Sequence, residues 1–75
     1  MANPLALKTA LKHLSTGQNL SETMMTDAMG EIMDGAASDA LLAGFLVGLR
    51  VKGETQEELA GAVRAMRQRA VAIRP

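Results

Sequence analysis

Very few side chains of this chain could carry out chemistry. His13 is the only histidine, and the chain has no cysteine. The lack of cysteine excludes thiolate nucleophiles, thiolate metal sites and disulfides, and a metal at His13 would need several further ligands around it. No serine or aspartate stands at a spacing that would complete a nucleophilic triad with His13. We therefore expect His13 to be an ordinary histidine at the surface or at the boundary of the core. We assign no catalytic, cofactor-binding or metal-binding residue.

Acidic residues occur in two close pairs, Asp27 with Glu31 and Glu57 with Glu58. The first pair lies opposite an apolar stripe, and the second falls in the first turn of an expected helix, where acids favour the helix dipole. Paired carboxylates that do acid–base chemistry need burial to separate their pKa values. We therefore expect both pairs to be solvated. The glycines are isolated and form no loop that could cradle a phosphate group.

The last part of the chain is its one basic stretch. Arg64, Arg67, Arg69 and Arg74 follow one another without an intervening acid, and a DNA-binding bundle would use such a helix for recognition. The whole chain has eight basic and eight acidic side chains and thus no net charge, whereas nucleic-acid modules show a basic excess. Arginines near the end of a helix are ordinary partners of its dipole. No nucleic-acid partner is therefore expected.

The sequence also lacks the pattern of a membrane protein. Its longest uncharged apolar run, residues 40–49, is half of the ~20 residues that a membrane-spanning helix needs. The first residues do not combine a charged segment with a following hydrophobic one. We expect no membrane contact and a cytoplasmic location, with which the absence of cysteine agrees.

The pattern of the whole chain predicts an all-α fold, a small four-helix bundle-like domain that spans residues 1–75. No stretch alternates apolar and polar residues with period two, and 48% of the residues are hydrophobic, enough to form a core. We expect the first helix to follow the cap Asn3, with Pro4 at its first position, and to stop near residues 16–17. Short loops predict roughly antiparallel neighbours. The other helices are expected to follow the caps Ser21, Ser38 and Thr55, and Gly35 and Gly53 end the second and third.

Two local patterns predict how helix starts are built. Thr55 and Glu58 have the spacing of a capping box, in which each side chain binds the backbone N–H of the other residue. Leu20, which precedes the cap Ser21, is placed to pack on Met25 as a hydrophobic staple.

Apolar residues recur with helical spacing on each segment and predict the core. On the first helix the stripe is formed by Leu7, Ala10, Leu11 and Leu14. Methionines at helical spacing on the second helix are typical of core filling, more than of a binding surface. The predicted core consists of Leu11, Leu14, Met25, Met29, Ile32, Leu42, Phe45, Leu46, Leu49, Leu59, Val63 and Met66.

The third helix carries a second apolar face, formed by Ala40, Gly44, Val47 and Val51. A helix that is apolar all round is buried or shared, and the pair Gly44 and Gly48 indicates close approach of another helix. We predict that this face, extended by Leu5, forms the contact of a homodimer. The alternative is that the first or fourth helix of the same chain covers it.

A set of segments forms a specific combination: residues 28–35, 38–40, 45–55, 58–61 and 64–67. They contain a Met-Gly pair before a helix stop, a Ser-Asp cap and the run Leu-Arg-x-Lys-Gly-Glu-Thr. This combination covers nearly the whole chain and resembles the N-terminal helical domain of the anthranilate phosphoribosyltransferase family. Pyrimidine nucleoside phosphorylases share the domain, but they typically lack an arginine that matches Arg50 and differ after the glycine that matches Gly53.

The resemblance implies an enzyme that transfers phosphoribosyl from phosphoribosyl pyrophosphate to anthranilate in tryptophan biosynthesis, with Mg²⁺ and as a homodimer. In that family the helical domain supplies much of the dimer contact and packs against a larger α/β domain, which holds the substrate-binding residues. Nothing here matches those residues, so none is carried over. We expect a domain whose C-terminal α/β domain is absent and which has no cofactor or activity of its own. A freestanding helical interaction module and, less favoured, a small DNA-binding bundle are the alternatives.

Overall fold

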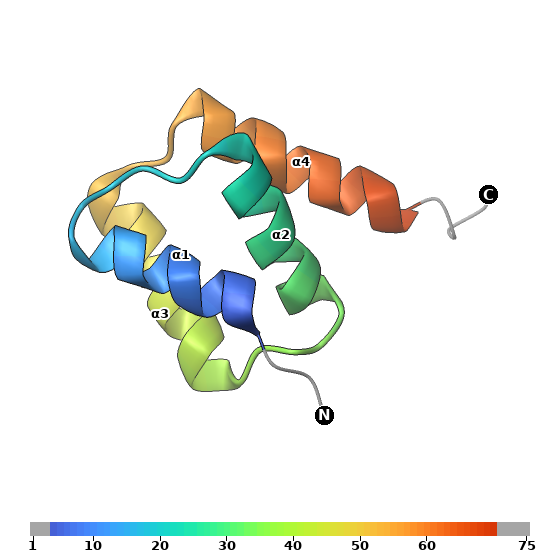
Figure 1. Cartoon of the computed structure of the whole chain (residues 1–75), viewed down its shortest axis with the longest axis horizontal. Helices are drawn as coiled ribbons and strands as arrows, with labels where there is room; N and C mark the ends of the chain where they lie inside the picture. Colours follow the sequence, from blue (N-terminus) through green and yellow to red (C-terminus); the bar gives the residue numbers. More distant parts are fainter. Residues whose placement is uncertain (1–3, 71–75) are drawn as a thin grey trace.

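The computed structural model describes residues 4–70, and every regular element in that range is a helix. The expected all-α fold with four helices is therefore confirmed for the described residues. Loops of three to six residues join the helices. The helices are α1 (Leu5–Ser15), α2 (Glu22–Met33), α3 (Asp39–Lys52) and α4 (Gln56–Ala70) (Figure 1).

The helices do not pack in chain order. Extended contacts join α1 to α2, α1 to α3 and, most extensively, α2 to α4. In Figure 1, α2 lies between α1 and α4, and α4 runs along one edge of the molecule. Of the consecutive pairs within residues 4–70, only α1 and α2 are in extended contact. Because α3 and α4 each have one principal packing partner, both keep broad outer surfaces.

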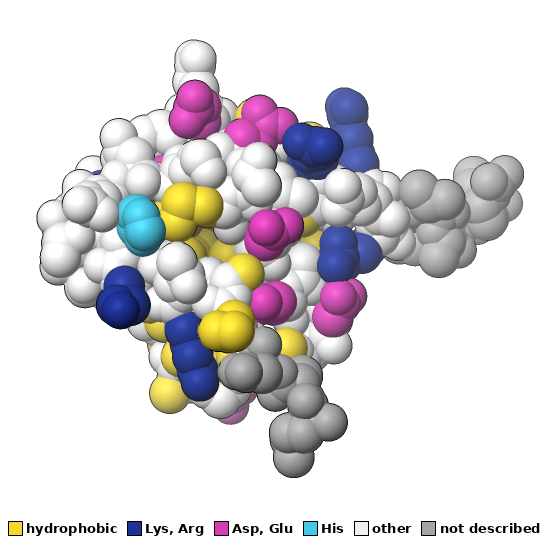
Figure 2. Space-filling view, in the orientation of Figure 1, with side chains coloured by type: hydrophobic (Ala, Val, Ile, Leu, Met, Phe, Trp, Pro, Cys, Tyr) yellow, Lys and Arg dark blue, Asp and Glu magenta, His cyan; other side chains and the backbone are white. Residues whose placement is uncertain are grey.

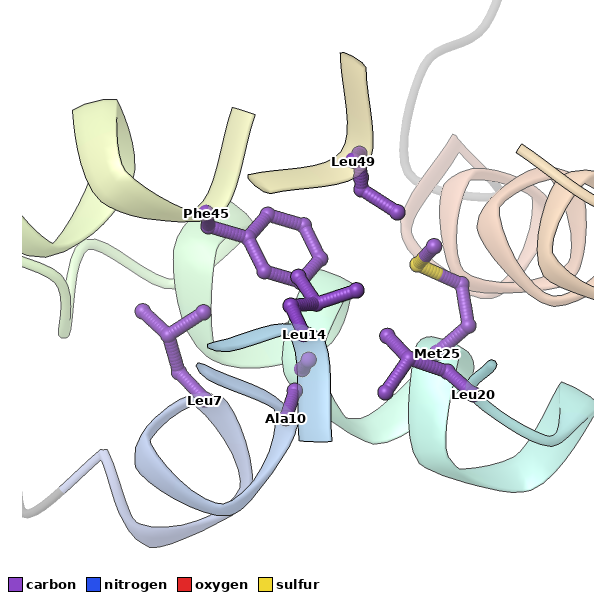
Figure 3. Close-up of a cluster of buried hydrophobic side chains, with 8 residues drawn as sticks. Leu7, Ala10, Leu14, Leu20, Met25, Phe45 and Leu49 are labelled. Atoms are coloured by element: carbon purple, nitrogen blue, oxygen red, sulfur yellow. The ribbon is translucent and has the colours of Figure 1, made fainter. Parts of the chain in front are cut away.

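The hydrophobic core forms where α1, α2 and α3 meet. The ring of Phe45 points from α3 toward Leu7 and Leu14 of α1, and Leu49 and Met25 point toward each other (Figure 3). Phe45 and Leu7 have no exposed surface, which confirms the central place of Phe45. The buried cluster consists of Leu7, Ala10, Leu14, Leu20, Met25, Ala28, Phe45 and Leu49.

Most of the predicted core on α1, α2 and the inner side of α3 is confirmed. Leu14, Met25, Phe45 and Leu49 are buried. Other predicted members are half-buried: Leu11, Met29 and Ile32, which pack against the cluster, and Leu42. Five buried hydrophobic residues were not in the predicted core: Leu7, Ala10, Leu20, Ala28 and Ala65. Leu20 had been predicted as a staple onto Met25, and the two residues do lie in the same cluster.

The predicted core is wrong for four large apolar residues. Leu46 on α3 is 54% exposed, and Leu59, Val63 and Met66 on α4 are between 43% and 52% exposed. The cause is the packing order, because α3 and α4 are not in extended contact with each other. The side of α3 that carries Leu46 therefore has no helix of this chain packed on it.

The start of α1 also differs from the prediction. The predicted cap Asn3 lies outside the described residues, and Pro4 occupies the N-cap position instead of the first helical position. The carboxylate of Glu31, on α2, accepts hydrogen bonds from the backbone N–H groups of Ala6 at 2.9 Å and Leu7 at 2.8 Å. A carboxylate at this end of a helix is also favoured by the helix dipole. Glu31, expected to be solvated, is thus a half-buried cap that ties α2 to α1.

The predicted caps of α2 and α3 are confirmed. The hydroxyl oxygen of Ser21 accepts a hydrogen bond from the backbone N–H of Met24 at 3.1 Å, and that of Ser38 accepts one from Leu41 at 3.2 Å. α2 ends at Met33, and Gly35, two residues later, has a φ of +81° that residues with a Cβ rarely adopt.

Candidate functional site

The outer face of α3 is apolar and uncovered. Residues 40–49 include no polar or charged side chain, yet only Phe45 and Leu49 of α3 are buried. Val47 is 61% exposed and Val51 is 82% exposed. A surface helix normally presents polar side chains to water, so an uncharged outer face is typical of a helix that meets a partner. We call the exposed residues predicted for this face the outer α3 strip: Ala40, Gly44, Val47 and Val51.

Two glycines of α3 bring this helix close to α1: Gly44, which is part of the strip, and Gly48, which lies beside it. A Cβ at Gly48 would lie 3.2 Å from the Cβ of Leu14, and a Cβ at Gly44 would lie 3.6 Å from the Cδ2 of Leu11. The predicted close approach of another helix is therefore confirmed, and that helix is α1 of the same chain. α1 packs against the glycines of α3, while Val47 and Val51 remain exposed.

Leu5, the remaining residue of the predicted dimer interface, is exposed at the start of α1. It lines a shallow hollow together with residues of α2 and α4, among them Glu31 and Arg69. No residue of the outer α3 strip lines that hollow. The structure thus brings the four residues of α3 together on one helix and places Leu5 beside a different surface.

A second apolar surface lies on α4, which sequence reasoning assigned to the core. Gly61 lies so close to α2 that a Cβ there would be 2.5 Å from the carbonyl oxygen of Glu22 and 2.8 Å from the Cβ of Met25. The hydroxyl of Thr26 donates a hydrogen bond to the carbonyl oxygen of Gly61 at 3.0 Å. α4 therefore presents small residues to α2. Its large apolar residues stay outside and form what we call the outer α4 stripe: Leu59, Val63 and Met66.

A buried ion pair joins the ends of three helices. The side chain of Glu58 has no exposed surface, and its Oε1 lies 2.8 Å from the Nζ of Lys52. The carboxylate also accepts hydrogen bonds from the backbone N–H groups of Leu20 at 2.6 Å and Thr55 at 2.9 Å. The hydroxyl oxygen of Thr55 accepts one from the N–H of Glu58 at 3.1 Å, which confirms the capping box. The prediction that Glu58 is solvated is wrong.

The ammonium group of Lys52 has further partners in this cluster. It donates hydrogen bonds to the side-chain oxygen of Asn19 at 3.1 Å and to the carbonyl oxygen of Gly53 at 2.7 Å. Lys52 and Glu58 thus hold the loop before α2, the end of α3 and the start of α4 together. The capping-box spacing was the only sequence signal for this cluster, and it does not reveal a third segment or burial.

Burial alone raises the pKa of the Glu58 carboxyl. Hydrogen bonds from the backbone N–H of Leu20, the side chain of Lys52 and the N–H of Thr55, together with the positive charge of Lys52, more than reverse this effect. The pKa of Glu58 is therefore lowered. The cluster is therefore a stabilised ion pair.

Two of the arginines of the basic stretch pair with acids at the two ends of α2, Glu22 in its first turn and Asp34 directly after its last residue. Arg69 forms a two-point pair with Asp34, with Nε to Oδ1 and Nη2 to Oδ2 distances of 2.9 Å. The Arg69 hydrogen bonds lower the pKa of Asp34, and the same contact raises the pKa of Arg69. Arg64 lies 3.6 Å from Glu22. On the face shown in Figure 2 the basic side chains are dispersed, and Arg74 lies outside the described residues.

The remaining candidates for chemistry stay apart. His13 is half-buried, and its Nδ1 lies 3.1 Å from the carbonyl oxygen of Thr9 in the preceding turn. Asp27 and Glu57 are exposed, as predicted. Within residues 4–70, no three His, Asp or Glu side chains are grouped so that they could hold a metal ion. No helix in the same range has the length and apolar character needed to cross a membrane.

Comparison with known proteins finds relatives that share one name in several bacteria. The chain is 45% identical to an anthranilate phosphoribosyltransferase of Desulfotalea psychrophila over 71 residues, which are 95% of this chain and 20% of that protein. Proteins of the same name from Brevibacillus brevis and Syntrophobacter fumaroxidans are 48% and 46% identical over 62 and 67 residues. These cover 83% and 89% of this chain, and 18% and 20% of the relatives. The chain thus spans about a fifth of the length of the curated relatives it matches.

A family described as "Glycosyl transferase family, helical bundle domain" matches residues 8–70. The match includes nearly all of the four helices, the close contact of α2 with α4 and the Lys52–Glu58 pair. The resemblance noted from the sequence segments is thereby confirmed. The chain belongs to the helical bundle domain family of the glycosyl transferases.

Proposed function

We propose that the chain is the N-terminal helical domain of an anthranilate phosphoribosyltransferase and that it serves as a dimerisation domain. The observation that carries the first part is the identity of 43% to 48% with enzymes of that name over most of this chain. The outer α3 strip supports the second part, because it is apolar, uncharged and exposed.

In this proposal, the chemistry resides in a larger α/β domain that these 75 residues do not include. That domain would bind phosphoribosyl pyrophosphate, anthranilate and Mg²⁺ and transfer the phosphoribosyl group in tryptophan biosynthesis. The described part of this chain has no carboxylate cluster for a metal ion. The proposal assigns no step of the reaction to its residues. A cytoplasmic location belongs to the same proposal.

The dimer proposal assigns the outer α3 strip to a second copy of this chain. Folding of one copy removes little of the accessible surface of Val47 and Val51 from water, since 61% and 82% of it remains exposed. A two-fold contact buries the same residues on both copies, and an uncharged strip sets no like charges against each other in such a contact.

A chimera tests the enzymatic part of the proposal. This chain replaces the matching N-terminal segment of the Desulfotalea psychrophila enzyme, with which it is 45% identical over 71 residues. We expect the purified chimera to form phosphoribosylanthranilate from phosphoribosyl pyrophosphate and anthranilate. The matched control carries the four-helix domain of a pyrimidine nucleoside phosphorylase at the same place and is expected to be inactive. A chimera that folds but is inactive would contradict the proposal.

A further inference from the structure

One exposed face of α3 combines an apolar centre with opposite charges at its two ends. Asp39, Ala43, Leu46 and Arg50 follow one another at spacings of four, three and four residues, which places them on one face of the helix. All four are exposed, Leu46 by 54%. We call this set the α3 side row. It borders the outer α3 strip, because Val47 of that strip directly follows Leu46.

The two charges of the α3 side row are not paired within one copy. None of the ion pairs within residues 4–70 includes Asp39 or Arg50. Each charge agrees with the dipole of its own helix, since Asp39 lies in the first turn of α3 and Arg50 in the last. The dipole explains which end of the helix each charge occupies, but it does not explain why both share a face with Leu46. Charges that flank the apolar seam of two packed helices determine the choice and the direction of the partner helix.

One antiparallel arrangement of two copies satisfies every member of the α3 side row. In such a contact, residues at equal distances on either side of the two-fold axis lie opposite each other. The axis that sets Asp39 opposite Arg50 of the second copy lies midway between these two positions. The same point is midway between Ala43 and Leu46, so the large side chain of Leu46 lies opposite the small one of Ala43. Charge and size therefore select the same register independently.

A parallel arrangement would conflict with these charges. A two-fold axis along the helices sets each residue beside its own counterpart, so Asp39 would lie beside Asp39 and Arg50 beside Arg50. Like charges placed together in an interface oppose association. The antiparallel arrangement avoids this conflict, and it also brings the positive end of each helix dipole near the negative end of the other.

We propose that the dimer forms by antiparallel contact of two α3 helices, held in register by two symmetric ion pairs between Asp39 of one copy and Arg50 of the other. Leu46 packs against Ala43 of the other copy at the centre, and the outer α3 strip lies beside this seam. This inference rests on the proposed dimerisation role. It adds the direction and register of the two copies and the charged residues that select a like partner.

Charge reversal tests this register. Asp39→Lys places a cation opposite Arg50 of the second copy, and Arg50→Glu places a carboxylate opposite Asp39. We expect each single variant to raise the dissociation constant of the dimer on the order of tenfold or more. The double variant exchanges the two charges, so it should restore most of the affinity of the wild type. Sedimentation equilibrium at low salt measures these constants, and high salt should reduce the differences because it screens exposed charges.

A matched control separates pairing between copies from effects on the helix itself. Glu57 and Arg67 occupy the first and last turns of α4 and are exposed, so Glu57→Lys with Arg67→Glu makes the same change to a helix dipole outside the α3 side row. We expect this control to dimerise like the wild type. Circular dichroism monitors the helix content of every variant. If a reversal reduces it, Asp39→Asn and Arg50→Gln remove the charges without reversing them, and each should still weaken the dimer.

The outcomes distinguish this inference from the proposed function. A wild-type chain that stays monomeric would contradict the dimerisation role and the register with it. A wild-type dimer that the single variants leave unchanged would overturn the register while the dimerisation role stands. A double variant that is as weak as the single ones, or a control that is equally weakened, would also overturn the register.

Discussion

Glu58 is the residue on which the arrangement of this small domain depends most. A buried carboxylate is costly unless its charge and its lone pairs are satisfied. Here the ammonium of Lys52 and two backbone N–H groups satisfy them, and no buried side-chain nitrogen or oxygen atom in the described residues lacks a partner. Because the partners come from three segments of the chain, the pair specifies where α4 begins relative to the start of α2 and the end of α3.

Replacing this carboxylate should therefore cost far more than replacing an exposed one. We expect Glu58→Gln to lower the free energy of unfolding by about 3–5 kcal/mol, because it leaves the Lys52 ammonium nearly buried without a counter-charge. Asp34→Asn, which removes the exposed pair with Arg69, is the matched control and should change stability only slightly. Urea unfolding followed by circular dichroism measures both. Equal urea midpoints for the two variants would show that the buried pair is not important.

The lowered pKa of Glu58 predicts a loss of stability in acid. The unfolded chain titrates near the ordinary value of 4.5 and the folded chain below it, so the unfolded state binds more protons between these values. The contribution of Glu58 is complete above the ordinary value and is lost as the pH falls through the folded value. We expect unfolding in urea at a series of pH values to show this fall, and to show it less steeply in Glu58→Gln. A variant with the same pH dependence as the wild type would contradict the assignment.

Among the elements, α4 owes its position to one glycine. Gly61 allows the backbones of α4 and α2 to come so close that Thr26 can donate a hydrogen bond to its carbonyl oxygen. The same closeness leaves the outer α4 stripe without a partner in this chain. A glycine within a helix is unfavourable in itself, so this one is explained by the packing of α4 on α2.

Two glycine-to-alanine substitutions should have opposite effects. Gly61→Ala places a methyl group 2.5 Å from the carbonyl oxygen of Glu22, and forcing the helices apart should cost about 1–3 kcal/mol. Gly44→Ala makes only an ordinary contact with Leu11 and should stabilise the chain by up to ~1 kcal/mol through its better helix propensity. Thermal unfolding compares them directly. Stabilisation by Gly61→Ala would show that α2 and α4 are not in close contact.

The two neighbouring residues Phe45 and Leu46 on α3 should also respond differently. Phe45 has no exposed surface, and Phe45→Ala should cost about 3 kcal/mol or more, enough to unfold a domain of this size. Leu46 is 54% exposed, so Leu46→Ala should cost less than ~1 kcal/mol. The sequence pattern places both residues in the core and therefore predicts a large cost for both. Circular dichroism of the two variants decides between these expectations, and unfolding by Leu46→Ala would show that Leu46 belongs to the core.

The elements were predictable because their signals are local. The Ser21 and Ser38 caps, the capping box at Thr55 and the glycine at the end of α2 each act within a few residues, and the structure has all of them. The contacts that order the helices are not local. Glu58 meets Leu20 across 38 positions and Glu31 meets Ala6 across 25 positions, and nothing in the spacing of a carboxylate indicates so distant a partner.

At the scale of the whole molecule, the domain has more apolar surface than one copy can bury. The helical spacing of the apolar residues correctly predicted that α3 has apolar residues on two faces. It also placed Val47 and Val51 on the face away from the core. It assigned Leu59 to the core because a stripe of helical period is equally consistent with an inner and an outer face. Which face is inner depends on the partner helix, and α2 selects the small residues of α4. The apolar surface that remains exposed on α3 is the basis of the proposed dimer.

The dimer predicts a specific effect of charge on the outer α3 strip. Changing Val47 to Glu and Val51 to Asp leaves the fold of one copy intact, because both valines are exposed. In a dimer, the same carboxylates would be buried without partners and would cost several kcal/mol. The matched control makes the same kind of change at exposed residues away from the outer α3 strip, with Gln18→Glu and Thr23→Asp.

Sedimentation equilibrium of the 75-residue chain and these two double variants, with circular dichroism to monitor helix content, tests the dimerisation role most directly. We expect the wild type and the control to be dimers and the Val47→Glu, Val51→Asp variant to be a monomer with the helix content of the wild type. A wild type that stays monomeric, a variant that remains dimeric, or a variant that loses its helices would contradict the assignment of this surface to a second copy.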